Sequence, residues 1–141
     1  MDTSFHQEFA LAPDAYGWTG KFPGGPHRLF EKEIALEIHT RLIPIEPVVL
    51  PDVSGRQANL VRAIAPGLPI ILKRVEKELI DYAYKFDPKF NEVIDRPHVW
   101  LNCEDDDGPS WTFVVGRADS PDFGYHLEFK GSEFIRIWAA D

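Results

Sequence analysis

The residues best suited to proton transfer are Asp122 and His126, which lie four positions apart near the end of the chain. A carboxylate that orients an imidazole is a common arrangement for a general base. The segment from Phe123 to Phe129 alternates apolar and polar residues, which predicts a strand. In an extended strand the two side chains share a face but stand roughly 13 Å apart, too far for a hydrogen bond. A catalytic pair therefore requires a bend at Gly124; without it, Asp122 closes the preceding turn and His126 faces outward.

A second candidate is a run of consecutive acidic residues: Glu104, Asp105, Asp106 and Asp107. Clustered carboxylates suit hard cations such as Ca²⁺. If Gly108 takes the sixth position of a calcium loop, however, the first position falls on Cys103 and the twelfth on Val114 instead of a bidentate glutamate. The run therefore predicts a solvated loop between strands and no metal site.

Cys103 is the only cysteine of the chain, and it is a possible nucleophile with His98 or His126 as its base. It alternates with Val99 and Leu101, which predicts a buried and unreactive thiol on the apolar side of a strand. The sequence contains no GxSxG, HExxH, P-loop or dinucleotide-binding motif. We therefore expect no cofactor, and a function without catalysis is favoured.

The charge of the chain bears on its partners. With 15 basic and 23 acidic residues the net charge is −8, and residues 99–141, with nine acids and three bases, account for −6 of it. Such a surface repels phosphate backbones, so nucleic acid is not expected as a partner. A basic protein would instead be attracted and steered toward the chain.

Length and composition predict one globular domain. The chain has 141 residues, and the hydrophobic fraction of 44% is enough to build a core. Residues 1–14 show no clear period and predict a poorly ordered N-terminal arm, followed by a single domain over residues 15–141. No stretch approaches the ~18 apolar residues of a membrane span, and the first residues lack the basic start of a secretory signal. We expect a cytoplasmic protein with no membrane partner.

Period-two patterns predict strands at 16–22, 34–38, 98–104, 111–117, 122–130 and 133–139, the last two joined by a tight turn at Gly131. Between the second and third strands, Ser54 and Gln57 form a capping box that opens a helix ending at Pro66-Gly67. A second helix carries one apolar stripe: Leu68, Leu72, Val75, Leu79 and Tyr82. The order β-β-α-α-β-β-β-β predicts an α+β fold in which two helices pack on one face of an antiparallel sheet of about six strands.

The last predicted strand places large side chains on both faces. Regular alternation would put Phe134, Arg136 and Trp138 on one face and the intervening Ile135 and Ile137 on the other. If the first face is exposed, Trp138 beside Arg136 is an anchor for a partner, because Trp and Arg are frequent at the energetic centre of interfaces. If it is buried, the strand is a central one. The sequence leaves both interpretations open.

The order of elements resembles small bacterial domains of unknown function, some of which lie beside polymorphic toxins and are treated as candidate immunity proteins. The resemblance rests on five features: Tyr16-Gly17-Trp18, the strand Ile34 to Ile38, Gln57 opening a helix, the tyrosines Tyr82 and Tyr84, and the element Asp122 to His126. It covers most of residues 16–139, although here Gly124 precedes the histidine. Immunity proteins work by covering their target, so the resemblance implies binding without catalysis.

Three functions follow from these observations. The first is a binding domain that neutralises a basic partner such as a toxin, with contacts at Glu104, Asp105, Asp106, Asp107, Arg136 and Trp138. The second is a small hydrolase-like enzyme that uses Asp122, His126 and the acidic loop. The third is a structural domain that forms a homodimer through its sheet.

Overall fold

The computed structural model describes residues 4–42, 49–103 and 110–140, and over these residues the chain has an α+β fold. The main sheet has seven strands in the order β1-β2-β5-β6-β7-β8-β9, and β3 pairs with β4 apart from it. The strands run over Ala12–Pro13 (β1), Gly17–Gly20 (β2), Arg28–Leu29 (β3), Lys32–Glu33 (β4), Ala35–His39 (β5), Ile94–Leu101 (β6), Ser110–Arg117 (β7), Ser120–Lys130 (β8) and Glu133–Ala140 (β9).

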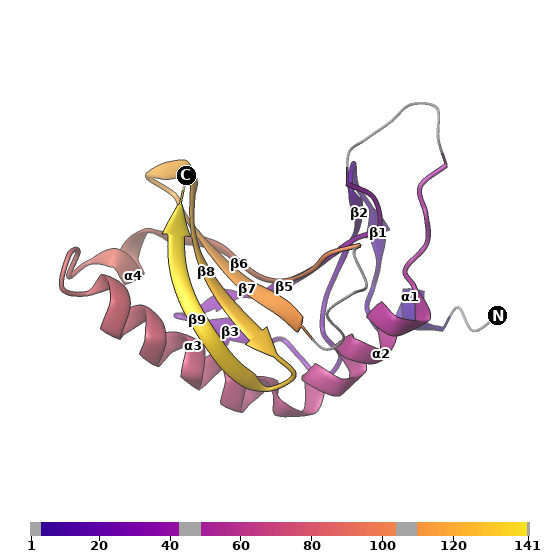
Figure 1. Ribbon diagram of the computed structural model, residues 1–141, viewed down its shortest axis with the longest axis horizontal. Helices are drawn as coiled ribbons and strands as arrows, with labels where there is room; N and C mark the ends of the chain where they lie inside the picture. The colour runs from indigo at the N-terminus through magenta and orange to yellow at the C-terminus, as the bar shows by residue number, and fades with distance from the viewer. Residues whose placement is uncertain (1–3, 43–48, 104–109, 141) are drawn as a thin grey trace.

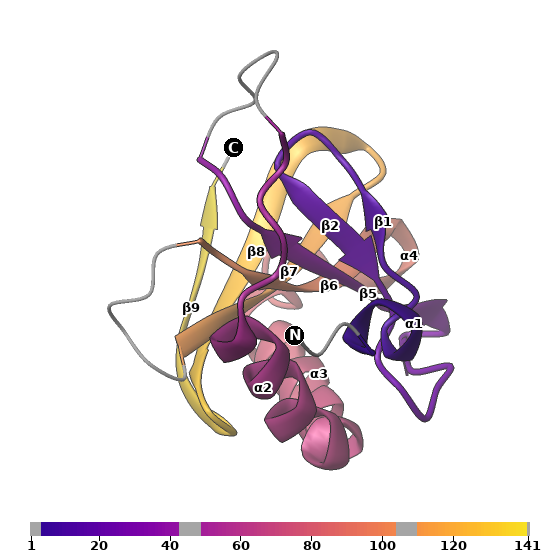
Figure 2. The ribbon, with the colours of Figure 1, turned by 90° about the vertical axis from the view of Figure 1, so that its right-hand side faces the viewer.

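The helices lie together on one face of the main sheet (Figures 1 and 2). They run over Phe5–Glu8 (α1), Gly55–Ile64 (α2), the 3₁₀ turn Ala65–Gly67 (η1), Leu68–Ala83 (α3) and Phe90–Val93 (α4). The predicted capping box is present, because the Gln57 backbone N–H donates to Ser54 Oγ at 3.0 Å and the Ser54 N–H donates to Gln57 Oε1 at 3.0 Å. The α3 stripe packs as predicted: Leu68, Leu72, Val75 and Leu79 are buried. No helix among the described residues is long and apolar enough to cross a membrane.

One pair of strands departs from the predicted antiparallel sheet. β5 and β6 are parallel, with Ala35 opposite His98 and Ile38 opposite Leu101, while every other neighbouring pair of the main sheet is antiparallel. The reason lies in the connection, because α2 and α3 both stand between these strands and carry the chain back to the end where β5 began. The sheet is therefore mixed.

The core lies between the helices and the sheet. Leu36 and Ile38 of β5 face it, as do Val99 and Leu101 of β6 and Phe113 of β7. Part of the expected N-terminal arm, the helix α1 and the residue after it, packs against this core. Phe5 and Phe9 are 6% and 0% exposed, and Arg62 of α2 donates to Glu8 Oε1 at 2.8 Å. Two large rings hidden from water hold this segment against α2.

A β-bulge in β9 changes which residues share a face. Glu128 pairs with Arg136 and Phe129 with Phe134, so Ile135 is an extra residue with no partner on β8. The bulge turns Phe134 to the helix side, where it packs against the core with Ile137. Arg136 and Trp138 remain on the opposite face. The prediction that Phe134 shares a face with Arg136 and Trp138 is therefore wrong: of these three residues, only Arg136 and Trp138 lie on the face of the sheet opposite the helices.

Candidate functional site

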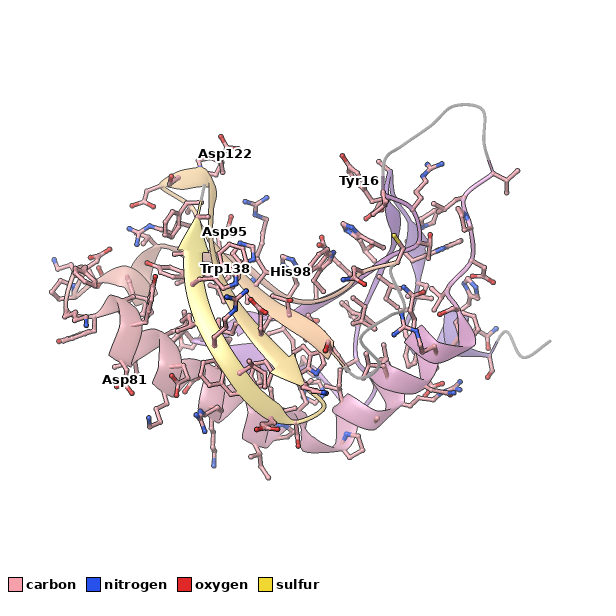
Figure 3. All side chains as sticks on the ribbon, in the orientation of Figure 1. Tyr16, Asp81, Asp95, His98, Asp122 and Trp138 are labelled. Carbon is pink, nitrogen blue, oxygen red and sulfur yellow. The ribbon has the colours of Figure 1, made fainter. Side chains whose placement is uncertain are left out.

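The face of the sheet opposite the helices is the candidate site, and we call it the helix-free face. Cross-strand pairing places His98, Val114, His126 and Trp138 in one row across β6, β7, β8 and β9. A neighbouring row holds Glu37, Trp100, Thr112, Glu128 and Arg136. Residues paired across strands point to the same side of a sheet, so these side chains form one surface. In Figure 3, Tyr16 and Asp122 lie toward its two ends and His98 lies between them.

At the β9 end of this face, Trp138 is held in one orientation. Its indole Nε1–H donates to Glu128 Oε2 at 2.6 Å, and Arg136 Nε–H donates to the same oxygen at 2.7 Å. The His126 ring stacks flat on the Trp138 ring, with centroids 4.1 Å apart and an interplanar angle of 7°. Even so, Trp138 is 38% exposed. A large aromatic surface is thus fixed and open to solvent on the helix-free face.

In the middle of the face, His98 lies between two acceptors. Its Nε2 is 3.1 Å from Glu37 Oε2, and its Nδ1 is 2.8 Å from the backbone oxygen of Arg96. A ring that carries hydrogen on both nitrogens donates to both acceptors. The Arg96 carbonyl reaches this place because β6 has a register shift between Asp95 and His98, with Arg96 at a φ of 48°. The hydrogen bond from His98 lowers the pKa of Glu37 below its ordinary value of 4.5.

A hollow of about 290 Å³ opens beside this pair. Its polar lining comes from Glu37, Arg96, His98, Asp122 and His126. It exists because Gly116 and Gly124, which pair across β7 and β8, leave this part of the sheet without side chains. A Cβ at Gly124 would stand 3.2 Å from His126 Nε2. Gly124, which the sequence suggested as the site of a bend, therefore forms part of the floor of a small polar hollow.

The His126 imidazole is tuned toward its neutral form. Partial burial lowers its pKa below the ordinary value of 6.5, positive charge on His98 lowers it further, and Glu128 opposes the shift. Across the described residues, His126 makes its ring contact with Trp138 and no hydrogen bond. At neutral pH the ring thus offers both a donor and an acceptor to the hollow.

The predicted site residues are partly brought together. Asp122 and His126 line the same hollow, and Arg136 and Trp138 lie side by side through Glu128. Asp122 is exposed within β8 and does not close a turn before it. Cys103 lies beyond the end of β6 and is half-buried, not buried as predicted, and it does not line the hollow. The acidic run Glu104 to Asp107 lies outside the described residues.

The sequence reasoning missed Glu37 as a site residue and gave His98 only a role as a base for Cys103. Both occupy outward positions of strands, where a polar residue is expected for solubility alone. Their approach depends on the parallel pairing of β5 with β6, which was not predicted. The signal that could have found them is the pair of successive amphipathic strands that carry a carboxylate and an imidazole on their polar sides.

Comparison of the chain with protein-family models, with curated proteins and with solved structures found no match.

Proposed function

We propose that the chain is a non-catalytic binding domain that covers a basic surface of another protein, such as a toxin, with its helix-free face. The observation that carries the proposal is Trp138, an aromatic ring fixed by Glu128 and His126 and still 38% exposed. Residues of this kind dominate the energy of interfaces, and fixing them before binding lowers the entropy that association costs. We place the protein in the cytoplasm, because its one cysteine is free and a free thiol is typical of a reducing compartment.

Charge supports a basic partner. The net charge of −8 attracts a positively charged protein at long range. On the helix-free face, Glu37, Asp122 and Glu128 supply carboxylates, and the run Glu104 to Asp107 falls in the sequence between β6 and β7, two strands of this face. The layout that resembles candidate immunity domains gives an example of such a partner, a toxin.

The test uses three synthetic peptides of equal length that are rich in Lys and Arg, uncharged, or rich in Asp and Glu. Binding to the isotopically labelled protein is followed by NMR. The basic peptide should bind most tightly and shift the signals of His98, His126 and Trp138. Trp138→Ala should weaken its binding, whereas Tyr84→Ala, which removes an aromatic side chain 54% exposed at the end of α3, should not.

Equal binding of all three peptides, or shifts confined to the helix side of the molecule, would contradict the proposal. So would a Trp138→Ala variant that binds the basic peptide as tightly as the original protein. Circular dichroism of each variant shows whether a loss of binding reflects a loss of fold.

A second candidate function is a small enzyme, and one observation favours it: Asp122 and His126 line a common hollow with the Glu37–His98 pair. Among the described residues, the side chains that line this hollow and could take part in chemistry are carboxylates and imidazoles, which suit general acid–base catalysis. The test is hydrolysis of model esters, amides and phosphodiesters. Turnover that His126→Gln abolishes would favour the enzyme; no turnover above background would leave the binding function alone.

A further inference from the structure

We propose that the hollow on the helix-free face receives the charged end of a Lys or Arg side chain from the basic partner. The inference rests on the proposed function and adds to it a specific recognition site. The hollow is about 290 Å³, which suits one long side chain. Its floor is the glycine pair Gly116 and Gly124, and its sides come from β5, β6 and β8.

The groups in the hollow that remain free to bind a ligand are Asp122 and His126. Glu37 and His98 are paired with each other. Arg96 donates a hydrogen bond to the Pro121 carbonyl at 3.2 Å, and its Nε lies 3.4 Å from Asp95 Oδ2. Within the ranges 4–42, 49–103 and 110–140, Asp122 has no hydrogen bond or ion pair, and His126 has no hydrogen bond. A carboxylate and an imidazole lone pair are both acceptors, so they complement a donor.

The charge of the hollow favours a positively charged hydrogen-bond donor over a neutral one. The Glu37 carboxylate is paired with the His98 ring at 3.1 Å, and the Arg96 guanidinium lies 3.4 Å from a carboxylate oxygen of Asp95. Asp122 then leaves one negative charge without a partner among the described residues, and His126 adds none while it is neutral. An anionic ligand would meet the carboxylates of Asp122 and Glu37. A metal ion is disfavoured, because the described residues hold no group of three or more side chains placed to ligate one.

The stacked rings at one side of the hollow add to this preference. His126 forms part of the lining, and its ring is stacked on Trp138 at 4.1 Å. Trp138 does not line the hollow itself, so it acts there by holding the His126 ring in place. The alkyl part of a Lys or Arg side chain can lie along the rings while its charged end reaches Asp122.

The test uses N-acetyl-lysine-N-methylamide and N-acetyl-arginine-N-methylamide as probes, with the uncharged glutamine derivative as a third. Binding is followed by NMR at the backbone signals of Gly124 and His126. We expect saturable shifts with one or both cations and none with the glutamine probe. Asp122→Asn should weaken binding roughly tenfold, the effect of losing one charge-assisted hydrogen bond. Gly124→Ala should abolish it, because the added methyl group fills the floor.

Matched controls are Asp81→Asn on α3, which Figure 3 shows apart from His98 and Asp122, and Gly55→Ala, whose added Cβ meets no atom within 4 Å. Both should bind the probes as the original protein does. Because Asp122 is exposed, its variant should fold even if Gly124→Ala does not. Unchanged binding in Asp122→Asn, or equal binding of the glutamine probe, would overturn the inference.

The two proposals fail differently. If the basic peptide binds and depends on Trp138 but not on Asp122 or Gly124, the hollow is not the recognition site and the binding function stands. If the basic peptide leaves the helix-free face unchanged, the proposed function fails, whatever the small probes do.

Discussion

His98 shows how a single residue on a sheet becomes fixed. Its ring nitrogens face Glu37 Oε2 at 3.1 Å and the Arg96 oxygen at 2.8 Å, so the ring has little freedom to rotate. The pair sits on the surface of the sheet, where the Glu37 side chain is 34% exposed and solvent weakens the interaction. Its contribution to stability is therefore modest and is best detected through its dependence on pH.

We predict that the Glu37–His98 pair makes the protein less stable in acid. The pKa of Glu37 is lowered in the folded protein, so the pair stabilises the fold above the ordinary value of 4.5. This stabilisation is lost as the pH falls from that value through the lowered pKa, because the unfolded chain binds the proton first. Urea unfolding between about pH 6 and pH 3 should show a smaller loss of unfolding free energy for Glu37→Gln than for the original protein.

The control for this prediction is Glu92→Gln, which removes an exposed carboxyl group on α4. It should follow the acid dependence of the original protein. If Glu37→Gln and Glu92→Gln lose stability in parallel, the hydrogen bond from His98 does not stabilise the Glu37 carboxylate.

The elements that local sequence determines were the ones that could be predicted. The capping box at Ser54 and Gln57 depends on neighbours in the chain, and so does the turn in which Gly131 has a φ of 60°. The α3 stripe follows from a period of 3.6 residues. These patterns give the class of fold, because the order of strands and helices already implies helices packed on one side of a sheet.

The features that were missed depend on contacts between distant segments. The bulge at Ile135 is invisible to a period-two pattern, which assigns Phe134 to the wrong face. The shift in β6 at Arg96 and the parallel pairing of β5 with β6 are likewise set by register, which no local signal fixes. The candidate site was therefore predicted only in fragments: Asp122, His126, Arg136 and Trp138 were found, but not the geometry that joins the first two to Glu37 and His98.

At the scale of elements, Gln57 is expected to carry more stability than its position in a cap suggests. It is 4% exposed, and its Nε2 donates to the His39 carbonyl at 2.9 Å and to the Asn102 carbonyl at 2.8 Å. His39 is the last residue of β5, and Asn102 directly follows the last residue of β6. One side chain thus ties the start of α2 to the parallel pair that it connects.

We predict that Gln57→Leu lowers the free energy of unfolding by about 2–4 kcal/mol. The substitution leaves both carbonyls without this donor and removes half of the capping box. Chemical denaturation measures the change. Asn59→Ala, on the exposed side of the same helix, is the matched control and should cost under about 1 kcal/mol. If Gln57→Leu lowers the free energy of unfolding as little as the control does, water molecules satisfy the two carbonyls as well as the Gln57 amide does.

At the scale of the whole molecule, two kinds of force should act at different stages of binding. The net charge of −8 acts over distances near the Debye length, about 10 Å at 0.1 M salt, and so affects the encounter. The Trp138 ring acts only once surfaces touch. Charge should therefore set the association rate, and the aromatic anchor should set the dissociation rate.

We predict that raising the salt concentration slows association of the basic peptide and leaves its dissociation rate nearly unchanged, as measured by surface plasmon resonance. Trp138→Ala should do the reverse, because it removes a contact formed after the encounter. Asp81→Asn, a change of one charge on the helix side, should slow association slightly and leave dissociation as it was. If salt instead accelerates dissociation as strongly as Trp138→Ala does, the acidic groups act as direct contacts, and the helix-free face holds its partner by charge and not through the Trp138 ring.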